Sequence, residues 1–446
     1  MTLPGFRPEV GDMFGQKKHG GFLAPGMDFA FGFTGDGYID RALQNDWLIC
    51  NDSVVSPASS NALEDLQLRI SLEPIRDLKI DLTANRTRNR SREIQYMFEG
   101  MPDTRSGNFS MSIISIGSAF ERPSAGDGYH SGTFERFRRN LDVIRDRVES
   151  QFLGAQYPQG SILAGKTFDP ANGTISKHSP DVMIPAFLAA YTGKSARNSA
   201  LDFFPSLFSM MPNWRITYTG LTKIAWFKKN FRSVNLNHAY RSTYSVGSYN
   251  TFQSFMSYMG DIGFVEDVQS GNPIPSSRFD ISMVSINEQF SPLIGMDATL
   301  KNGLTAKVEY KTSRILNLSM SACQLVETAS RDFVIGLGYK IVNFNLFSGR
   351  NVKDSKNRVS HDLALRADIS FRNQSALCRD IQQGFAQATN GNKALKISCS
   401  ADYTLSRLLT LRLYYDRQQN TPLVSSSSYP VVSADFGFSM KFSLTR

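Results

Sequence analysis

The sequence predicts an all-β fold, a transmembrane antiparallel β-barrel with a few short helical insertions. Apolar residues recur at every second position through most of the second half, which is the spacing of strands. No segment approaches the roughly 18–20 uninterrupted apolar residues of a membrane helix. The chain also ends on a row of large apolar side chains at alternate positions, with no polar tail behind them.

The composition is compatible with this class and with a soluble one. Of the 446 residues, 41% are hydrophobic, a value that suits a water-soluble protein. A barrel strand needs only about 9–11 residues, of which alternate positions are apolar, so its mean hydropathy is unremarkable. The pattern along the chain, and not the composition, carries the prediction.

Residues 1–125 are predicted to hold barrel strands with long loops. The strand-like runs are Gly26 to Thr34, Leu63 to Pro74, Leu78 to Thr87 and Phe109 to Gly117. The N-terminus "MTLPGFRPEVGDMFG" lacks the apolar core of a signal peptide. An exported chain of this sequence is therefore expected to be incomplete at its front end.

Residues 126–212 are predicted to form a helical and loop insertion. Phe134, Phe137, Leu141, Ile144, Val148 and Phe152 are three or four positions apart, which indicates an amphipathic helix. Because arginines occupy its other positions, the helix could lie on a membrane surface, but packing over the rest of the protein is favoured. A second helix is predicted in "SPDVMIPAFLAAYTGK", with Ser179 as N-cap and Gly193 as stop. Both helices are expected in the lumen of the barrel or capping it, since lipid excludes irregular chain.

Residues 213–446 are predicted to be C-terminal barrel strands. The strongest hairpin signal is Asn302-Gly303, with alternating residues on both sides, and Ser406-Arg407 is a second tight connection. Long polar loops are predicted at 373–392 and 417–430. Together with the short turns, they resemble the two ends of an outer-membrane barrel. The long stretch 342–360 does not fit that alternation.

The terminal stretch "ADFGFSMKFSLTR" resembles the C-terminal signal read by the barrel assembly machinery. Asp435, Gly437, Met440 and Phe442 occupy the positions of that signal. A closed barrel has no open edge in lipid, so this strand would pair at closure. Two sets of side chains are predicted: the lipid-facing residues are Phe436, Phe438, Leu444, Leu409, Leu411 and Leu413, and the lumen-facing residues are Arg412 and Asp416. Trp214 and Tyr218 either belong to an interfacial aromatic belt or are packed aromatics, and the sequence favours neither.

No catalytic, cofactor-binding or metal-binding group is predicted. Four cysteines occur without a CxxC pair or a histidine at ligand spacing, and we interpret them as isolated small hydrophobes. The formal charge is +9, with the densest basic cluster in "NRTRNRSR". We interpret this cluster as a solvated loop or a channel wall and expect no nucleic-acid partner, because no known nucleic-acid module is evident.

Several long stretches are similar to one protein family. "DVMIPAFLAAYTGK", "DFFPSLFSMMPNWRITYTGL", "FRSVNLNHAYRSTYSVGSY", "INEQFSPLIGMDATLKNGLTAKVEYKTSRILNLSMS" and "SADYTLSRLLTLRLYYDRQQNTPLV" closely resemble the C-terminal part of the SprA/Sov family. The similarity is dense from about Asp181 to Arg446 and looser before it, as in "LPGF" and "MFG". This family forms the outer-membrane translocon of the type 9 secretion system, which also serves gliding motility.

The resemblance implies more than the residues alone. It implies the C-terminal portion of a very large barrel, in the class whose strand number reaches roughly 36. It implies a cell outer-membrane location and passage of folded cargo proteins that carry a C-terminal targeting domain. The implied partners are a PorV-type barrel, a periplasmic plug protein, the barrel assembly machinery and membrane lipid. Because the chain is far shorter than a full family member, we expect a fragment or split product that begins at an internal Met1.

Two rival functions remain open. An ordinary outer-membrane porin or transporter would explain the alternation and the terminal strand, but not the family stretches. A soluble β-rich enzyme or lectin would require a convergent acid–base pair, and none stands out. A calcium loop in "GFTGDGYID" lacks the spacing of an EF-hand, so a Gly/Asp-rich turn is favoured.

Overall fold

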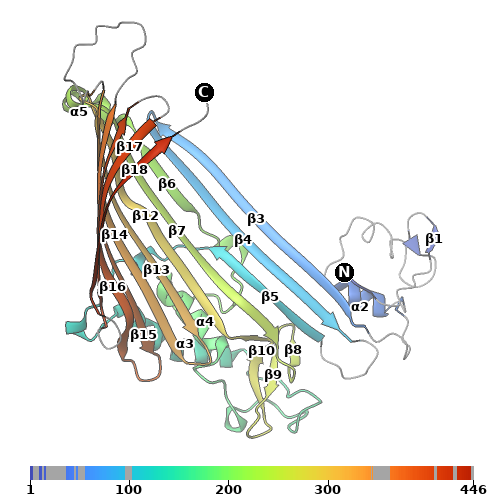
Figure 1. Ribbon diagram of the computed structural model, residues 1–446. Coiled ribbons are helices and arrows are strands. Elements are labelled where there is room, and N and C mark those ends of the chain that lie inside the picture. The colour runs from blue at the N-terminus through green and yellow to red at the C-terminus, as the bar shows by residue number, and fades with distance from the viewer. Residues whose placement is uncertain are drawn as a thin grey trace, which may run out of the picture.

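The computed structural model describes residues 1–3, 10–12, 15–16, 37–44, 47–48, 56–95, 103–342, 344, 362–405, 409–424 and 429–442. Antiparallel β-structure dominates them (Figure 1). The α-helices are α2 (Gly37–Gln44), α3 (Gly132–Ser150), α4 (Pro180–Tyr191) and α5 (Ala225–Asn230). Short 3-10 turns are η1 (Ile116–Ser118), η2 (Ala125–Asp127), η3 (Pro170–Asn172), η4 (Leu207–Ser209) and η5 (Gly220–Lys223).

The strands fall into one large sheet and two small ones. The small sheets are β1 (Val10–Asp12) with β2 (Gly15–Gln16), and β8 (Met256–Met259), β9 (Ile262–Glu266) and β10 (Pro273–Ser277). The large sheet contains β3 (Ala58–Ile75), β4 (Leu78–Ile94), β5 (Asp103–Ser112), β6 (Asn213–Tyr218), β7 (Phe231–Thr251), β11 (Phe279–Ile281), β12 (Met283–Leu300), β13 (Leu304–Ser319), β14 (Gln324–Ile341), β15 (Leu363–Asp380), β16 (Ala386–Thr404), β17 (Leu409–Pro422) and β18 (Val431–Phe442).

The large sheet is continuous from β18 to β3. Its order is β18-β17-β16-β15-β14-β13-β12-β7-β5-β4-β3, with β6 between β4 and β7 and β11 beside β7. The strands predicted in 1–125 and in 213–446 therefore share one sheet. Within the part of the chain that the structure describes, β3 and β18 are its two edges and do not pair with each other.

The predicted hairpin at Asn302-Gly303 is confirmed. It joins β12 to β13, and Gly303 has a φ of 89°, a conformation that only glycine adopts without strain. The Asn302 side-chain oxygen accepts a hydrogen bond from the Leu304 backbone nitrogen at 3.0 Å. The run Gly26 to Thr34 and the connection Ser406-Arg407 lie outside the described residues.

The long loop predicted at 373–392 is wrong, and the one predicted at 417–430 begins later than predicted, after Pro422. β15 continues to Asp380 and β16 begins at Ala386, so most of 373–392 is a paired hairpin. β17 likewise continues to Pro422. The end of β15 looks like a loop in sequence because its buried Arg379 bonds to the polar chain of the insertion at a position where the alternation would place an apolar side chain. Strands of this length exceed the roughly 9–11 residues that cross a bilayer.

The insertion, defined as residues 113–212, holds both predicted helices. Ser131 caps α3 by accepting a hydrogen bond from the Phe134 backbone nitrogen at 3.1 Å. Ser179 is the N-cap of α4, and Gly193 follows its end with a φ of 73°. The predicted apolar stripe of α3 is buried, so the prediction that this helix packs over the protein is confirmed, and the alternative that its apolar stripe lies on a membrane surface is wrong.

The core lies between the insertion and one end of the large sheet. In Figure 1, α3, α4 and β8–β10 gather at the lower end, whereas α5 and the end of β18 lie at the upper end. The buried cluster joins α3 and α4 to side chains of β5, β7, β12 and β13. Phe137 of α3 and Phe187 of α4 meet edge to face at 5.9 Å.

Candidate functional site: a sheet with two different faces

Alternation gives the large sheet one apolar face. Neighbouring strands place apolar partners opposite each other, so that Tyr310, Phe333, Phe371 and Leu395 form one row across β13–β16. The next row towards the upper end is Val308, Ile335, Ile369 and Ile397. Because partners in register lie on the same side of the sheet, these rows form a continuous band.

The predicted lipid-facing residues belong to this apolar face. Met440 pairs with Leu411, Phe438 with Leu413, and Phe442 with Leu409. Phe436 is 73% exposed, and the other β18 side chains of the row are also exposed. Leu444 lies outside the described residues. At the far edge, Leu68, Ile70 and Leu72 of β3 are exposed as well, opposite Ala84, Leu82 and Ile80 of β4.

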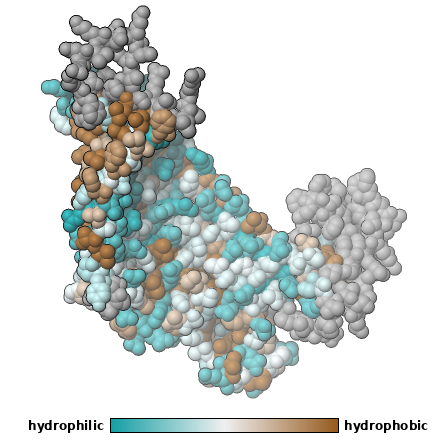
Figure 2. All heavy atoms as spheres, in the orientation of Figure 1, coloured by the Kyte–Doolittle hydropathy of each residue, from teal (hydrophilic) through white to brown (hydrophobic). Residues whose placement is uncertain are grey.

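The exposed band is too large for an ordinary soluble surface. Soluble monomers rarely expose contiguous apolar patches of more than a few hundred Å², whereas exposed large apolar side chains of this face recur from β3 to β18, with Val234 of β7 and Ala298 of β12 buried among them. On β14 it runs from Phe333 to Ile341, about nine residues, which is the length of a membrane-crossing strand. Figure 2 shows hydrophobic side chains over the upper ends of the C-terminal strands.

The opposite face of the sheet is polar. The predicted lumen-facing residues Arg412 and Asp416 both lie on it, since they alternate with Leu411, Leu413 and Tyr415. Arg412 lies 3.6 Å from Asp402 on the neighbouring strand. Further ion pairs on this face join Arg372 to Asp332 at 2.9 Å and Lys311 to Glu309 at 2.9 Å. Hydrophilic residues cover the middle of the sheet in Figure 2.

Gly437 lies on this polar face, opposite Tyr414. A Cβ atom added to Gly437 would overlap the Tyr414 ring, which covers the glycine. The glycine of the terminal pattern therefore provides room for an aromatic ring of the preceding strand. Asp435, the first residue of that pattern, lies opposite Asp416, and like charges in directly opposite positions disfavour pairing.

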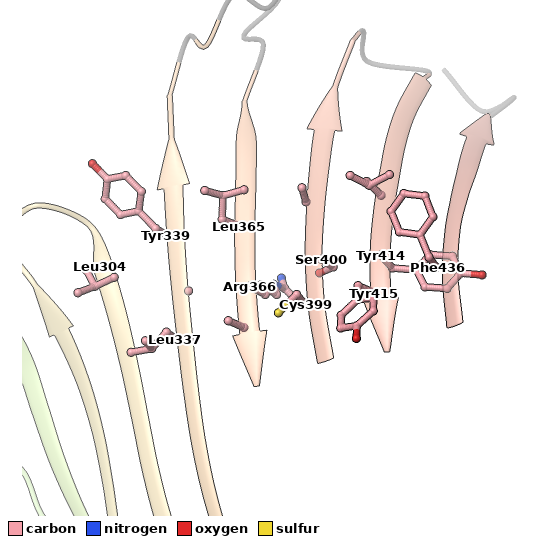
Figure 3. Close-up of a pocket in the computed structure, with 14 residues that line it drawn as sticks. Leu304, Leu337, Tyr339, Leu365, Arg366, Cys399, Ser400, Tyr414, Tyr415 and Phe436 are labelled. Atoms are coloured by element: carbon pink, nitrogen blue, oxygen red, sulfur yellow. The ribbon is translucent and has the colours of Figure 1, made fainter. Parts of the chain in front are cut away.

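A groove crosses the apolar face between β13 and β18 (Figure 3). Its volume is about 330 Å³. Ala367, Cys399 and Ala401 contribute small side chains, while Tyr339 and Phe436 are among the large residues that line it. Cys399 is a free thiol on this face, which agrees with its interpretation as a small hydrophobe.

The insertion packs on the apolar face, below the band. Leu325 and Glu327 of β14, which are buried, alternate in phase with Phe333 and Leu337 of the band. On β13 the buried Leu316 and Leu318 share their phase with Val308 in the same way. Both helices therefore pack on the apolar side of the sheet and not on the face that carries the predicted lumen-facing residues. A position in the lumen does not agree with that set of residues, and capping of the barrel stays a prediction.

A buried ion pair fixes the start of the insertion to the sheet. Arg314 of β13 donates to Glu288 of β12 at 2.7 Å, and both side chains are buried. Arg314 also donates to the carbonyl oxygen of Ser118 at 2.6 Å and to its hydroxyl at 2.8 Å. Glu288 accepts hydrogen bonds from Tyr240 at 2.8 Å and from Ser115 at 2.7 Å. Strand and insertion thus supply partners to both charged groups, through both terminal nitrogens of Arg314 but not through its Nε, which is buried without a hydrogen bond.

A second buried pair lies nearby. Arg379 of β15 donates to Glu327 of β14 at 3.0 Å and to the carbonyl oxygen of Tyr129 at 2.7 Å. Arg138 of α3 donates to the carbonyl oxygen of Ile381 at 3.0 Å. These contacts hold the insertion against the β15–β16 hairpin, which explains why that hairpin remains paired beyond the band.

The basic cluster "NRTRNRSR" is part of β4, so its interpretation as a solvated loop is wrong. Its arginines alternate onto the apolar-band side of the sheet, below the band, and not onto the polar face. The Arg86 guanidinium lies 5.2 Å from the Phe109 ring centroid, and that of Arg88 lies 4.9 Å from the ring of Phe204. Arg92 pairs with Asp40 at 2.7 Å and with Asp103 at 2.8 Å. The cluster is structural.

An aromatic row marks the border between band and insertion. Trp214 stacks on Tyr240 at 4.5 Å, Tyr240 meets Phe290 at 4.8 Å, and Phe290 meets Phe120 of the insertion at 5.4 Å. Tyr218 lies at the other end of β6, opposite Leu78. The two residues predicted for aromatic belts thus lie at opposite ends of this short strand.

Two carboxyl groups of the insertion have shifted pKa values. Burial alone raises the pKa of the Glu121 carboxyl, but hydrogen bonds from Ser131 and Thr133 outweigh it, so that pKa lies below its ordinary value. Asp181, at the start of α4, is buried. Burial raises its pKa, opposed by hydrogen bonds from Ser277, Ser276 and the backbone of Asp181 itself.

The sequence reasoning missed the buried charges Glu288, Arg314, Glu327 and Arg379. A signal for one of them was present, because Glu288 occupies an apolar position of the alternation Val284, Ile286, Phe290. A charge in phase with buried residues implies a buried partner. The partner Arg314 could not be identified without the register of β12 and β13.

Comparison with models of known protein families gave no match, and no curated protein matches the sequence. The described helices include none that is long and apolar enough to span a membrane. In the described ranges, no three or more histidine, cysteine, aspartate or glutamate side chains are grouped as metal ligands. That the chain is not an enzyme stays a prediction.

Proposed function

We propose that this chain forms part of the wall of a protein-conducting outer-membrane β-barrel, a component of the type 9 secretion translocon that passes folded cargo proteins to the cell surface. The observation that carries the proposal is the band of apolar side chains on one face of a sheet whose other face is polar and charged. A pore of this kind needs an apolar exterior and a polar, water-filled interior, and it needs no catalytic group.

The open edges support a wide pore. Unpaired backbone groups are not tolerated in lipid, so β3 and β18 must be continued by further strands. In the residues that the structure describes, the large sheet contains 13 strands and its two edges do not pair. Because barrel diameter grows with strand number, the completed barrel would be wider than a porin of ordinary size. The similarity of the sequence to the SprA/Sov family agrees with this.

The proposed partners follow from the same architecture. The polar face would meet cargo proteins that carry a C-terminal targeting domain, and the apolar band would meet membrane lipid and a PorV-type barrel. A periplasmic plug protein would close the lumen. The barrel assembly machinery would read the β18 pattern of Asp435, Gly437, Met440 and Phe442.

The first test determines the cellular location of the chain and the conductance of the complex that contains it. The chain is expressed with a cleavable signal peptide, and isolated outer membranes are analysed for a heat-modifiable band in unboiled samples. The complex that contains it is then reconstituted in planar bilayers. We expect membrane retention, a heat-shifted band and conductance well above that of a porin. Passage of small solutes alone would favour an ordinary porin, and a soluble, protease-sensitive product would contradict the proposal.

A further inference from the structure

Four large apolar side chains of the insertion are exposed where the insertion meets the band. Phe208 is 96% exposed and Phe120 is 55% exposed, and Leu207 and Met211 are also exposed. They come from two segments that are far apart in sequence. Both segments join the sheet at the border: Phe120 contacts Phe290 at 5.4 Å, and the Met211 backbone nitrogen donates to the carbonyl oxygen of Ser112 at 3.1 Å.

Neighbouring contacts fix these segments in place. Two residues before Phe120, Arg314 binds both the carbonyl oxygen and the hydroxyl of Ser118. Four residues before Phe208, the Phe204 ring packs against Phe109 at 5.6 Å. The exposed side chains are therefore presented by anchored chain. Such apolar surface indicates a non-aqueous neighbour.

The position of these residues identifies the neighbour. The insertion lies on the same face as the apolar band, so it projects over the membrane and not into the lumen. The aromatic row through Trp214, Tyr240 and Phe290 continues directly into Phe120. Aromatic girdles of this kind lie at the level of lipid headgroups. Continuity with the band thus favours lipid over a protein partner.

We propose that the insertion rests on the membrane surface, with Phe120, Leu207 and Phe208 inserted at the boundary of headgroups and acyl chains. Interfacial apolar residues are buried by about 5–10 Å at this boundary. The inference depends on the proposed function, because it requires the band itself to be in lipid. It adds a second membrane contact, made by the insertion next to the strands.

Spin labels at three positions test the proposal. In the full chain, isolated from membranes with its partners and placed in phosphatidylethanolamine–phosphatidylglycerol vesicles, the four cysteines are first replaced by serine. Phe208→Cys, Phe438→Cys and Val268→Cys are then labelled separately. Phe438 marks the band, and Val268 is a matched control because it is an apolar residue 99% exposed on the β9–β10 hairpin. Collision rates with oxygen, which enriches in lipid, and with a water-soluble nickel chelate are measured.

We expect the oxygen-to-nickel ratio to be highest at position 438, several-fold above the control at 208, and lowest at 268. A ratio at 208 equal to that at 268, with 438 still lipid-like, would overturn the inference and leave the proposed function intact. Shielding of 208 from both reagents would mean a protein contact and would also overturn it. If 438 behaves like 268, the proposed function fails together with the inference.

Discussion

The apolar face of the large sheet is built in the same way at its two ends, but it is covered differently. At the lower end Leu316 and Leu318 pack beneath the insertion and are buried. Val308 lies on the same strand, β13, and faces the same way, but it belongs to the band, which the insertion does not cover. The alternation of apolar residues therefore does not distinguish a protein neighbour from a lipid neighbour.

What distinguishes the two ends is the placement of charge. Under the insertion the apolar rows are interrupted by Glu288, Arg314, Glu327 and Arg379, each buried and paired. In the exposed band of β13–β18, the described side chains that face the same way as Phe333 are uncharged until Arg331, Lys393 and Arg417 are reached. A protein neighbour can supply hydrogen bonds to a buried charge, whereas hydrocarbon cannot.

Removing Arg314 should break the covered end most strongly. Arg314→Ala leaves the Glu288 carboxylate buried without its cation, and losing one partner of a buried pair costs about 3–5 kcal/mol. We expect the α3 amides to exchange hydrogen far faster in isolated membranes, because the insertion opens more often. The control is Arg372→Ala, whose pair with Asp332 is exposed on the polar face and contributes roughly 0–1 kcal/mol. Equal effects of the two variants would refute the anchoring role.

A charge placed in the uncovered band should have the next largest effect. An arginine on the lipid face at the bilayer midplane destabilises a barrel by about 2–4 kcal/mol. Phe438→Arg should therefore lower the urea concentration that unfolds the chain in vesicles. Ser433→Arg is the matched control, since Ser433 lies on the same strand and points to the polar face opposite the uncharged Gln418. If both substitutions are tolerated equally, the band does not meet hydrocarbon.

The α3 cap gives a smaller and pH-dependent effect at the covered end. Ser131→Ala removes the hydroxyl that accepts from the Phe134 backbone and donates to Glu121, and loss of such a cap costs about 1 kcal/mol. Because the pKa of Glu121 is lowered in the fold, its contribution is present above the ordinary pKa and is lost as the pH falls through the folded pKa.

The measurement is the opening free energy of the insertion by hydrogen exchange, as a function of pH. Wild type should lose stability in acid, and Glu121→Gln should flatten that part of the profile. Ser131→Thr keeps the hydroxyl and should remain close to wild type. An unchanged acid profile in Glu121→Gln would show that another carboxyl group is responsible.

The alternation was sufficient to predict most of the strands, the two helices and the two faces of the C-terminal pair, but not the paired ends of β15, β16 and β17. It was sufficient because period two and period 3.6 are local properties, readable from Leu409 to Tyr415 or from Phe134 to Val148 without any long-range information. The hairpin at Asn302-Gly303 was predictable for the same reason, because a tight turn depends on the backbone conformations that two adjacent residues can adopt.

The face on which the insertion packs could not be predicted in this way. The side chains beneath α3 and those of the band are both apolar and face the same side of the sheet. Only the register of β12 and β13, which places Arg314 beside Glu288, distinguishes the covered region from the exposed one. The arginines of β4 were misread for a related reason. Their stacking on Phe109 and Phe204 depends on a strand and a loop distant in sequence.

The smallest expected effect concerns Asp181, and it has the opposite sign. Its pKa is raised by burial, so any stability that it contributes is present below the ordinary pKa and is lost as the pH rises through the folded pKa. At neutral pH a buried carboxylate without a cation lowers the stability of the fold.

Asp181→Asn keeps an oxygen for the Ser277 backbone nitrogen, 3.2 Å away, and removes the charge. At neutral pH we expect the insertion of this variant to be as stable as that of wild type or slightly more stable. In acid we expect it to lose that advantage over wild type. Hydrogen exchange of the α4 amides measures both. A marked loss of insertion stability in Asp181→Asn at neutral pH would contradict this expectation. It would mean that the Asp181 carboxylate is stabilised by a cationic partner, which the packing of α4 does not explain.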